Sequence, residues 1–289
     1  MASKIATKNL TSYLWIAPVL LVITALVLFP FFWTLWTSLH AKLIGGEATF
    51  VGLTNFKDIL TSGTFTSSFV KTLLYTASAI ILKLLIGMAA ALALNRPFKG
   101  RNIVRGWLFI PWTLPKFAVA IIFLWLLRFG GGINLMLGEL GASPIFWLGP
   151  DHALTVVMAV NVWKGFPFFM VGILAGLQAI PQDLYDASAV DGASSLQQFA
   201  HVTLPALKDI VLVLSCLSTI WTFSEFDIVF ILTGGGPGTA TEILPVLTYL
   251  TAFRRYDLGK GSAIAVLSLF FFLPLIFWLV KLISKEAEV

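Results

Sequence analysis

Six long apolar runs constrain this 289-residue chain more than any other feature of its sequence. A helix needs about 20 consecutive apolar residues to cross the hydrocarbon core of a bilayer. Only 11% of the residues are charged, whereas a soluble domain carries about a quarter. We therefore expect an all-α integral membrane protein with a single membrane domain over residues 1–289. The expected spans are 13–39, 70–94, 104–127, 153–180, 210–233 and 261–280.

Basic residues in short loops indicate which side of the membrane a loop occupies. The loop 96–105 contains Arg96, Lys99, Arg101 and Arg105 and no acidic residue, so we expect it to face the cytoplasm. With six spans, both termini and the connection between the fourth and fifth spans then lie on the same side.

That connection, residues 181–207, is polar and predicts a helical hairpin outside the bilayer. Pro181 suits the first position of a helix, where its missing N–H costs nothing. Gly192 interrupts the pattern, and Ser194 or Ser195 can cap a second short helix. Pro205 is expected to close the stretch.

The hairpin resembles the cytoplasmic loop of permease subunits of binding-protein-dependent ATP-binding cassette (ABC) importers. Their pattern is Glu-Ala-Ala, three residues, Gly, and later Leu-Pro. Here Asp186, Ala187 and Ser188 precede Gly192, and Leu204-Pro205 follows. Asp replaces the leading Glu and Ser the second Ala. The resemblance implies the fold of a type I importer permease, with six transmembrane helices and a cytoplasmic coupling hairpin at 181–207. It also implies that four hairpin residues contact an ATPase: Asp186, Ala187, Ser188 and Gly192.

Three outer stretches resemble the carbohydrate-uptake branch of this family, the maltose and glycerol-phosphate type. They are Val51–Phe56, Gly132–Leu137 and Leu232–Pro237, the last followed by Thr241-Glu242. The resemblance implies a transport subunit for a sugar or sugar derivative in a bacterial or archaeal plasma membrane. The implied partners are a second permease, usually a different chain, two ATPase subunits and an extracytoplasmic solute-binding protein.

The sequence predicts no enzyme and no cofactor in this chain. It lacks the phosphate-binding motif G-x-x-x-x-G-K-[ST], and its three histidines lie in separate loops with no metal-ligand or catalytic spacing. ATP and Mg²⁺ are therefore expected on the partner ATPase.

Polar residues within the fourth and fifth spans predict a substrate site, because intramembrane charges usually face a bundle interior or a water-filled cavity. The residues recur at i, i+3, i+4 and i+7, which places each set on one helical face. The resemblance implies that these two helices line the substrate path. The candidate substrate-binding residues are Asn161, Lys164, Gly165, Phe168, Ser218, Trp221, Thr222 and Glu225.

Several alternatives remain open from the sequence. Lys164 and Glu225 could bind substrate hydroxyls, could form a structural ion pair, or Lys164 could anchor an anionic group of the substrate. Lys83 could face the partner permease, and Lys116 follows Pro115 at an expected helix break. The alternative function is a secondary transporter that uses Glu225 or Asp227 as an H⁺ or Na⁺ site, although the sequence shows no inverted repeat of the kind many such transporters carry.

Overall fold

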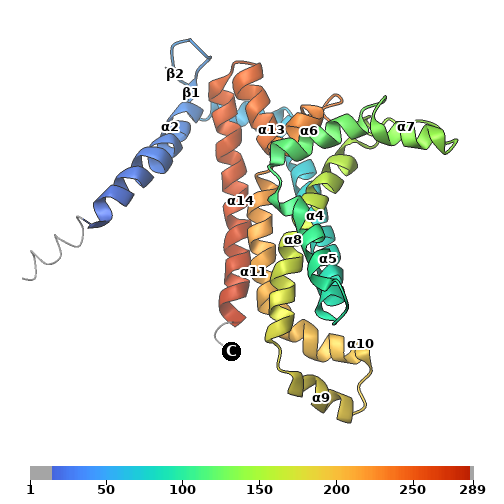
Figure 1. Ribbon diagram of the computed structural model, residues 1–289. Coiled ribbons are helices and arrows are strands. Elements are labelled where there is room, and N and C mark those ends of the chain that lie inside the picture. Colours follow the sequence, from blue (N-terminus) through green and yellow to red (C-terminus); the bar gives the residue numbers. More distant parts are fainter. Residues whose placement is uncertain (1–14, 287–289) are drawn as a thin grey trace, which may run out of the picture. The chain divides into compact units, whose positions relative to one another are not determined.

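The computed structural model describes residues 15–286, and these are mostly helical (Figure 1). Within this range two short strands, β1 (His40–Ala41) and β2 (Thr49–Phe50), pair antiparallel, and three π-helical turns occur: η1 (Thr24–Leu28), η2 (Phe199–Thr203) and η3 (Leu250–Arg254). The α-helices are α2 (Phe29–Ser38), α3 (Thr54–Thr61), α4 (Thr64–Asn95), α5 (Arg101–Thr113), α6 (Lys116–Leu127), α7 (Gly132–Glu139), α8 (Ala153–Ala179), α9 (Gln182–Val190), α10 (Ser195–Gln198), α11 (Leu204–Phe223), α12 (Asp227–Thr233), α13 (Leu244–Tyr249) and α14 (Leu258–Glu286).

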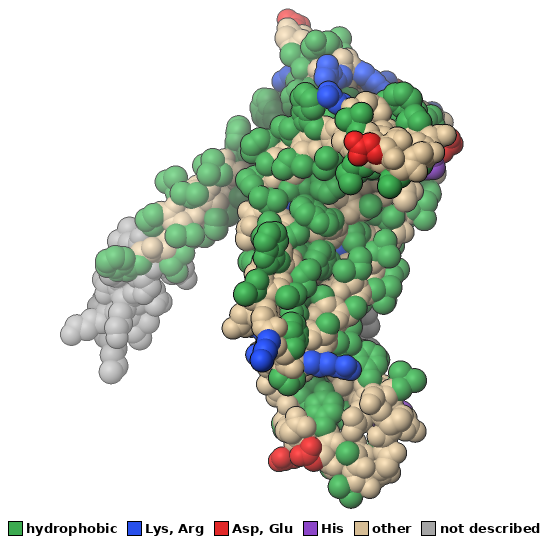
Figure 2. All heavy atoms as spheres, turned by 45° about the vertical axis from the view of Figure 1, so that its right-hand side comes forward, with side chains coloured by type: hydrophobic (Ala, Val, Ile, Leu, Met, Phe, Trp, Pro, Cys, Tyr) green, Lys and Arg blue, Asp and Glu red, His purple; other side chains and the backbone are tan. Residues whose placement is uncertain are grey.

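Six helical segments within the described residues are long and apolar enough to cross a membrane. Large apolar side chains are exposed along them, which suits contact with lipid. Figure 2 shows hydrophobic side chains covering the sides of the long helices. The prediction of a six-span, all-α membrane protein is confirmed, although residues 13 and 14 of the first expected span lie outside the described part. The segments are Trp15–Ser38, Thr64–Asn95, Lys116–Glu139, Ala153–Ala179, Ser195–Phe223 and Leu258–Trp278.

The third expected span, 104–127, is two helices in the structure. Helix α5 ends at Thr113 and α6 begins at Lys116, with Leu114 and Pro115 extended between them. Pro115 causes this break, because a proline lacks an N–H and disfavours the helical conformation of the residue before it. The break expected beside Lys116 is confirmed.

The fifth expected span, 210–233, also differs from the structure. Helix α11 begins earlier, at Leu204, and ends at Phe223, and α12 resumes the chain at Asp227. No proline or glycine marks residues 224–226, so the apolar pattern gave no sign of this interruption. The interruption leaves the Glu225 carboxylate close to the start of α12, where its Oε1 accepts a hydrogen bond from the Ile228 N–H at 3.2 Å.

The chain divides into two compact units, so the expected single membrane domain stays a prediction. The first unit contains the described residues up to Thr66 together with Leu247–Phe270. In it, buried Asn55 donates from its amide to the Ser38 and His40 carbonyls, at 2.9 Å each. Asn55 belongs to the first of the three outer stretches, Val51–Phe56. Its two hydrogen bonds join α3 to the end of α2 and to β1.

The second unit contains Ser67–Val246 and the described residues from Phe271 onward. Its apolar core lies between α4, α8 and α11 and includes Leu94, Phe169 and Leu207, all almost fully buried. A side chain added at Gly87 of α4 would lie 2.5 Å from the Phe169 Cβ. Gly87 therefore allows α4 and α8 to approach closely, as small residues do between membrane helices.

Candidate functional site

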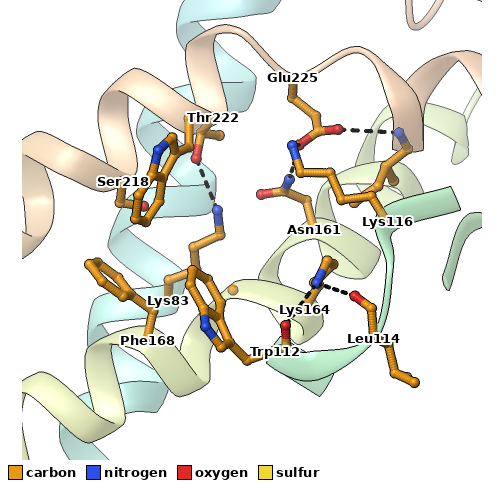
Figure 3. A pocket seen from close by; sticks show the side chains of 13 residues that line it. Lys83, Trp112, Leu114, Lys116, Asn161, Lys164, Phe168, Ser218, Thr222 and Glu225 are labelled. Atoms are coloured by element: carbon orange, nitrogen blue, oxygen red, sulfur yellow. Dashed lines mark hydrogen bonds and ion pairs between the residues drawn. The ribbon is translucent and has the colours of Figure 1, made fainter. Parts of the chain in front are cut away.

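A polar pocket of about 340 Å³ lies among α4, the α5–α6 break, α8 and the α11–α12 break, all within the second unit (Figure 3). The structure brings all eight sequence-predicted substrate residues to its wall. Their common location is a property of the fold. The pocket is also lined by five residues that were not among the eight: Lys83, Trp112, Leu114, Lys116 and Ile228.

The break between α5 and α6 turns backbone carbonyls toward the pocket. The Lys164 ammonium donates to the carbonyls of Pro111, Trp112 and Leu114, at 3.3, 3.2 and 2.7 Å. The last carbonyls of a helix have no partner within the helix and carry partial negative charge, so a cation is stabilised there. Lys164 thus holds the break in place from the neighbouring helix α8.

The break between α11 and α12 brings a carboxylate into the same pocket. Glu225 is only 2% exposed and forms an ion pair with Lys116, with 2.9 Å between Nζ and Oε2. The Asn161 amide nitrogen lies 3.3 Å from the same oxygen. The Asn161 Oδ1 is buried and has no hydrogen-bond partner within the described residues, so it is an available acceptor at the pocket.

The ion pair between Lys164 and Glu225, one of the alternatives left open by the sequence, is wrong. Lys116 takes the place beside Glu225, because the break after Pro115 directs the first residue of α6 toward the carboxylate (Figure 3). The suggestion that Lys83 faces a partner permease differs from the structure too. Lys83 is 5% exposed, and its ammonium donates to the Thr222 hydroxyl at 2.9 Å. In the sequence, the position of Lys83 and Lys116 inside apolar runs was the feature that could have indicated a place in the pocket.

Three aromatic rings form one side of the pocket. The Trp112 ring is stacked on Phe168 with 5.2 Å between centroids, and Trp221 meets Phe168 edge-on at 5.0 Å. Trp221 is 44% exposed despite its position in a membrane-spanning segment. Trp112 was missed from sequence because it precedes the helix break and belongs to neither periodic face. Together the rings provide apolar surface beside hydroxyl, amide and charged groups.

The hairpin 181–207 contains α9, α10, η2 and the first residues of α11, and Figure 1 shows α9 and α10 beyond the ends of α8 and α11. Gly192 has φ +80°, a left-handed conformation that glycine adopts without strain, which confirms the expected turn. Ser194 and Gln197 form a reciprocal capping box at the start of α10. The Tyr185 hydroxyl lies 2.9 Å from the Thr203 hydroxyl, so the two halves of the hairpin are joined.

Two details of the expected hairpin were wrong. Pro181 precedes α9 as its cap residue with extended backbone, and Gln182 is the first helical residue. Pro205 does not close the stretch, because the helix continues from α10 through η2 into α11. A π-helical turn that ends at Thr203, two residues before Pro205, accompanies this continuation. Such a turn changes the hydrogen-bond pattern near the point where the proline lacks its N–H. The hairpin's second arm is thus the start of a membrane helix.

The other two outer stretches each supply a buried polar residue that holds neighbouring backbone or side chains in place. Asn134 is buried in α7 and exchanges hydrogen bonds with the backbone of Ile145, at 2.9 and 3.0 Å, which fixes the following loop. Thr241 is fully buried and lies 2.6 Å from the Thr233 hydroxyl. These residues support the fold around the pocket and do not line it.

Residues 83–288 match the family described as "Binding-protein-dependent transport system inner membrane component". The chain is 40% identical over 93% of its length, and 92% of the relative's, to the trehalose/maltose transport system permease protein MalF of Thermococcus litoralis. It is 34% identical over 89% of its length, and 85% of the relative's, to the sulfoquinovosyl glycerol transport system permease protein SmoG of Agrobacterium fabrum.

The fold is also similar to a solved structure of a bacterial ABC transporter involved in import of the acidic polysaccharide alginate. The TM-score is 0.84 at 19% identity, with 98% of each chain covered. The alternative of a secondary transporter driven by H⁺ or Na⁺ is not supported, because family, relatives and fold all agree on another class. The chain belongs to the binding-protein-dependent inner membrane components and is a multi-pass permease subunit of an ABC importer, a transport protein whose family places ATP hydrolysis on a separate chain.

Proposed function

We propose that this permease carries a sugar or sugar derivative through the polar pocket. The observation that carries the proposal is the combination of three aromatic rings with hydrogen-bonding groups around one cavity. Aromatic faces suit the C–H surfaces of a sugar, and hydroxyl, amide, ammonium and carboxylate groups suit its hydroxyls. The Asn161 Oδ1, which is buried and unpaired within the described residues, would accept from a substrate hydroxyl. All eight predicted residues are assigned to the substrate site, Gly165 by leaving space for a neighbouring side chain.

The names of relatives support this substrate class. Those described above are named for trehalose/maltose and sulfoquinovosyl glycerol, and another, 30% identical over 92% of this chain and 85% of its own length, is the trehalose transport system permease protein SugA of Mycobacterium tuberculosis. A cargo with several hydroxyls therefore suits both the chemistry of the pocket and the relatives.

The hairpin 181–207 is proposed to dock on an ATPase subunit and to transmit its movement to α8 and α11. Helix α9 has no buried residue, and four large apolar side chains of the hairpin are exposed: Leu184 by 50%, Val190 by 88%, Leu196 by 77% and Leu204 by 42%. Apolar side chains gathered outside a membrane span are typical of an interaction surface. Asp186, Ala187, Ser188 and Gly192 are the proposed contacts, and ATP and Mg²⁺ would bind to the ATPase.

The complete importer is proposed to contain this chain, a different second permease, two ATPase subunits and an extracytoplasmic solute-binding protein. It would lie in the plasma membrane of a bacterium or archaeon, with both termini and the hairpin in the cytoplasm. The basic residues of 96–105 support this orientation, although the structure places the second half of this stretch in helix α5.

Coupling can be tested with two variants in the assembled transporter. Asp186→Lys reverses an exposed charge on α9, and Gly192→Leu places a side chain where φ is +80°. We expect both to lower substrate-stimulated ATP hydrolysis at least tenfold while substrate binding by the separate solute-binding protein stays normal. Asp183→Lys is the matched control on the same helix. Wild-type transport by both variants would refute the coupling role.

Orientation can be tested with single cysteines in a Cys216→Ser background. Ser143 and Ser195 are exposed and lie on either side of the single span α8, so they must face opposite sides of the membrane. An impermeant thiol reagent outside intact cells should label Ser143→Cys alone. Labelling of Ser195→Cys instead would reverse the proposed orientation.

A further inference from the structure

The charges around the polar pocket do not balance. Three lysines, Lys83, Lys116 and Lys164, line it together with a single carboxylate, Glu225. We propose that the cargo is an anionic sugar, one with a carboxylate, phosphate or sulfonate group, and that Lys83 binds this group. The proposal rests on the assignment of the pocket to sugar transport and adds the charge class of the sugar.

The three lysines are not equivalent. Lys116 is paired with Glu225 at 2.9 Å. Lys164 directs its ammonium to three backbone carbonyls of the α5–α6 break. Lys83 donates to one neutral group, the Thr222 hydroxyl. Among the described residues, no carboxylate is close enough to its ammonium, within 4.0 Å, to form an ion pair. An ammonium has three donors, so Lys83 retains donors for a ligand.

The position of Lys83 makes an unmatched charge costly. Only 5% of the residue is exposed, and it lies in the middle of the membrane-spanning helix α4. Removing an ion from water costs several kcal/mol unless an opposite charge and hydrogen bonds replace the water. Charged residues in membrane spans therefore commonly mark substrate or ion pathways. An anionic group on the cargo would provide the missing partner.

The neighbouring helix makes room for this lysine. A Cβ atom added at Gly165 of α8 would lie 2.5 Å from the Lys83 Cε and 3.0 Å from its Nζ. The aliphatic part of Lys83 thus passes directly over Gly165 to bring the ammonium to the pocket. Gly165, predicted as a substrate residue, acts here by leaving space for the side chain that binds.

The same surroundings favour an anion that is attached to a sugar. Figure 3 shows the Lys83 ammonium beside Thr222, with Phe168 and Trp112 nearby. A carboxylate or phosphate bound to Lys83 would leave the sugar ring to which it is attached beside these aromatic faces. A free inorganic anion would satisfy the charge and leave the rings without a contact.

The test measures binding to the purified assembled transporter, without its solute-binding protein, by titration calorimetry. Two matched pairs serve as probes: trehalose with trehalose 6-phosphate, and methyl glucoside with methyl glucuronide. We expect the anionic member to bind at least about tenfold more tightly in at least one pair, equivalent to about 1.4 kcal/mol. Lys83→Met should reduce this ratio to about one, whereas Lys83→Arg should keep a preference. Lys99→Met, which removes an exposed lysine outside the pocket, should change nothing.

If Lys83→Met does not assemble, Gly165→Ala tests the same point by displacing Lys83, and it should also lower the ratio. Equal or better binding of the neutral sugars would overturn the anion proposal and leave the sugar assignment standing. Persistence of the preference without Lys83 would overturn the role of this residue. Inorganic phosphate that binds as tightly as trehalose 6-phosphate would overturn the attached-sugar site. Binding of none of the four sugars would overturn both the anion proposal and the sugar assignment.

Discussion

The ion pair between Lys116 and Glu225 gives the sharpest quantitative prediction. Its Nζ–Oε2 distance is 2.9 Å, Glu225 is 2% exposed and Lys116 is 42% exposed. Exposed pairs contribute about 0.2–1 kcal/mol, and removal of one partner of a buried pair costs about 3–5 kcal/mol. Because solvent reaches the lysine but not the carboxylate, we expect a coupling energy of about 1–2 kcal/mol.

The measurement is a double-mutant cycle of Lys116→Met and Glu225→Gln, with the free energy of unfolding obtained by SDS titration in mixed micelles. Lys116→Met should be the more harmful single change, since it leaves a buried carboxylate with only the Asn161 amide and the Ile228 N–H. Glu225→Gln should restore part of that loss. The parallel cycle of Lys164→Met with Glu225→Gln should show less coupling, because Lys164 is bound to carbonyls. A larger coupling in the second cycle would refute the assignment of partners.

Gly165→Ala should abolish most sugar uptake into proteoliposomes, since its added methyl would lie 2.5 Å from the Lys83 Cε. Gly106→Ala, which has open space around it, should retain wild-type uptake in that assay. Ser194→Ala should cost about 1 kcal/mol through loss of the helix cap and should lower stimulated ATPase activity severalfold, while Ser195→Ala should not. Trp221→Ala should weaken sugar binding about two- to tenfold in calorimetry, because an aromatic contact contributes about 0.5–1.5 kcal/mol beyond area burial; unchanged affinity would exclude its ring from the site.

Much of the fold could be predicted because the bilayer imposes simple rules. Runs of about 20 apolar residues identify spans, and a polar stretch with Gly192 and Ser194 identifies a hairpin between two of them. The eight pocket residues could be found because helical periodicity places residues at i, i+3, i+4 and i+7 on one face. The family resemblance then indicated which faces to consider.

Other features depend on contacts between segments distant in sequence. The interruption after Phe223 has no proline or glycine, and its Glu225 is held by Lys116, 109 residues earlier in the chain. Lys83 and Thr222 are likewise separated by 139 residues. Periodicity within one helix indicates which residues share a face but not which helix that face meets. The choice of ion-pair partner among three lysines therefore needed the structure.

The proposed function is transport of a sugar with energy from ATP that a partner subunit hydrolyses. The direct measurement is uptake of labelled neutral and anionic sugars into proteoliposomes that contain the complete transporter, with ATP inside, solute-binding protein outside and ion gradients collapsed. At least one sugar should accumulate, and its accumulation should require ATP and disappear with Gly192→Leu. Accumulation without ATP under an imposed ion gradient, or no uptake of any sugar by the complete transporter, would refute ATP-driven sugar transport.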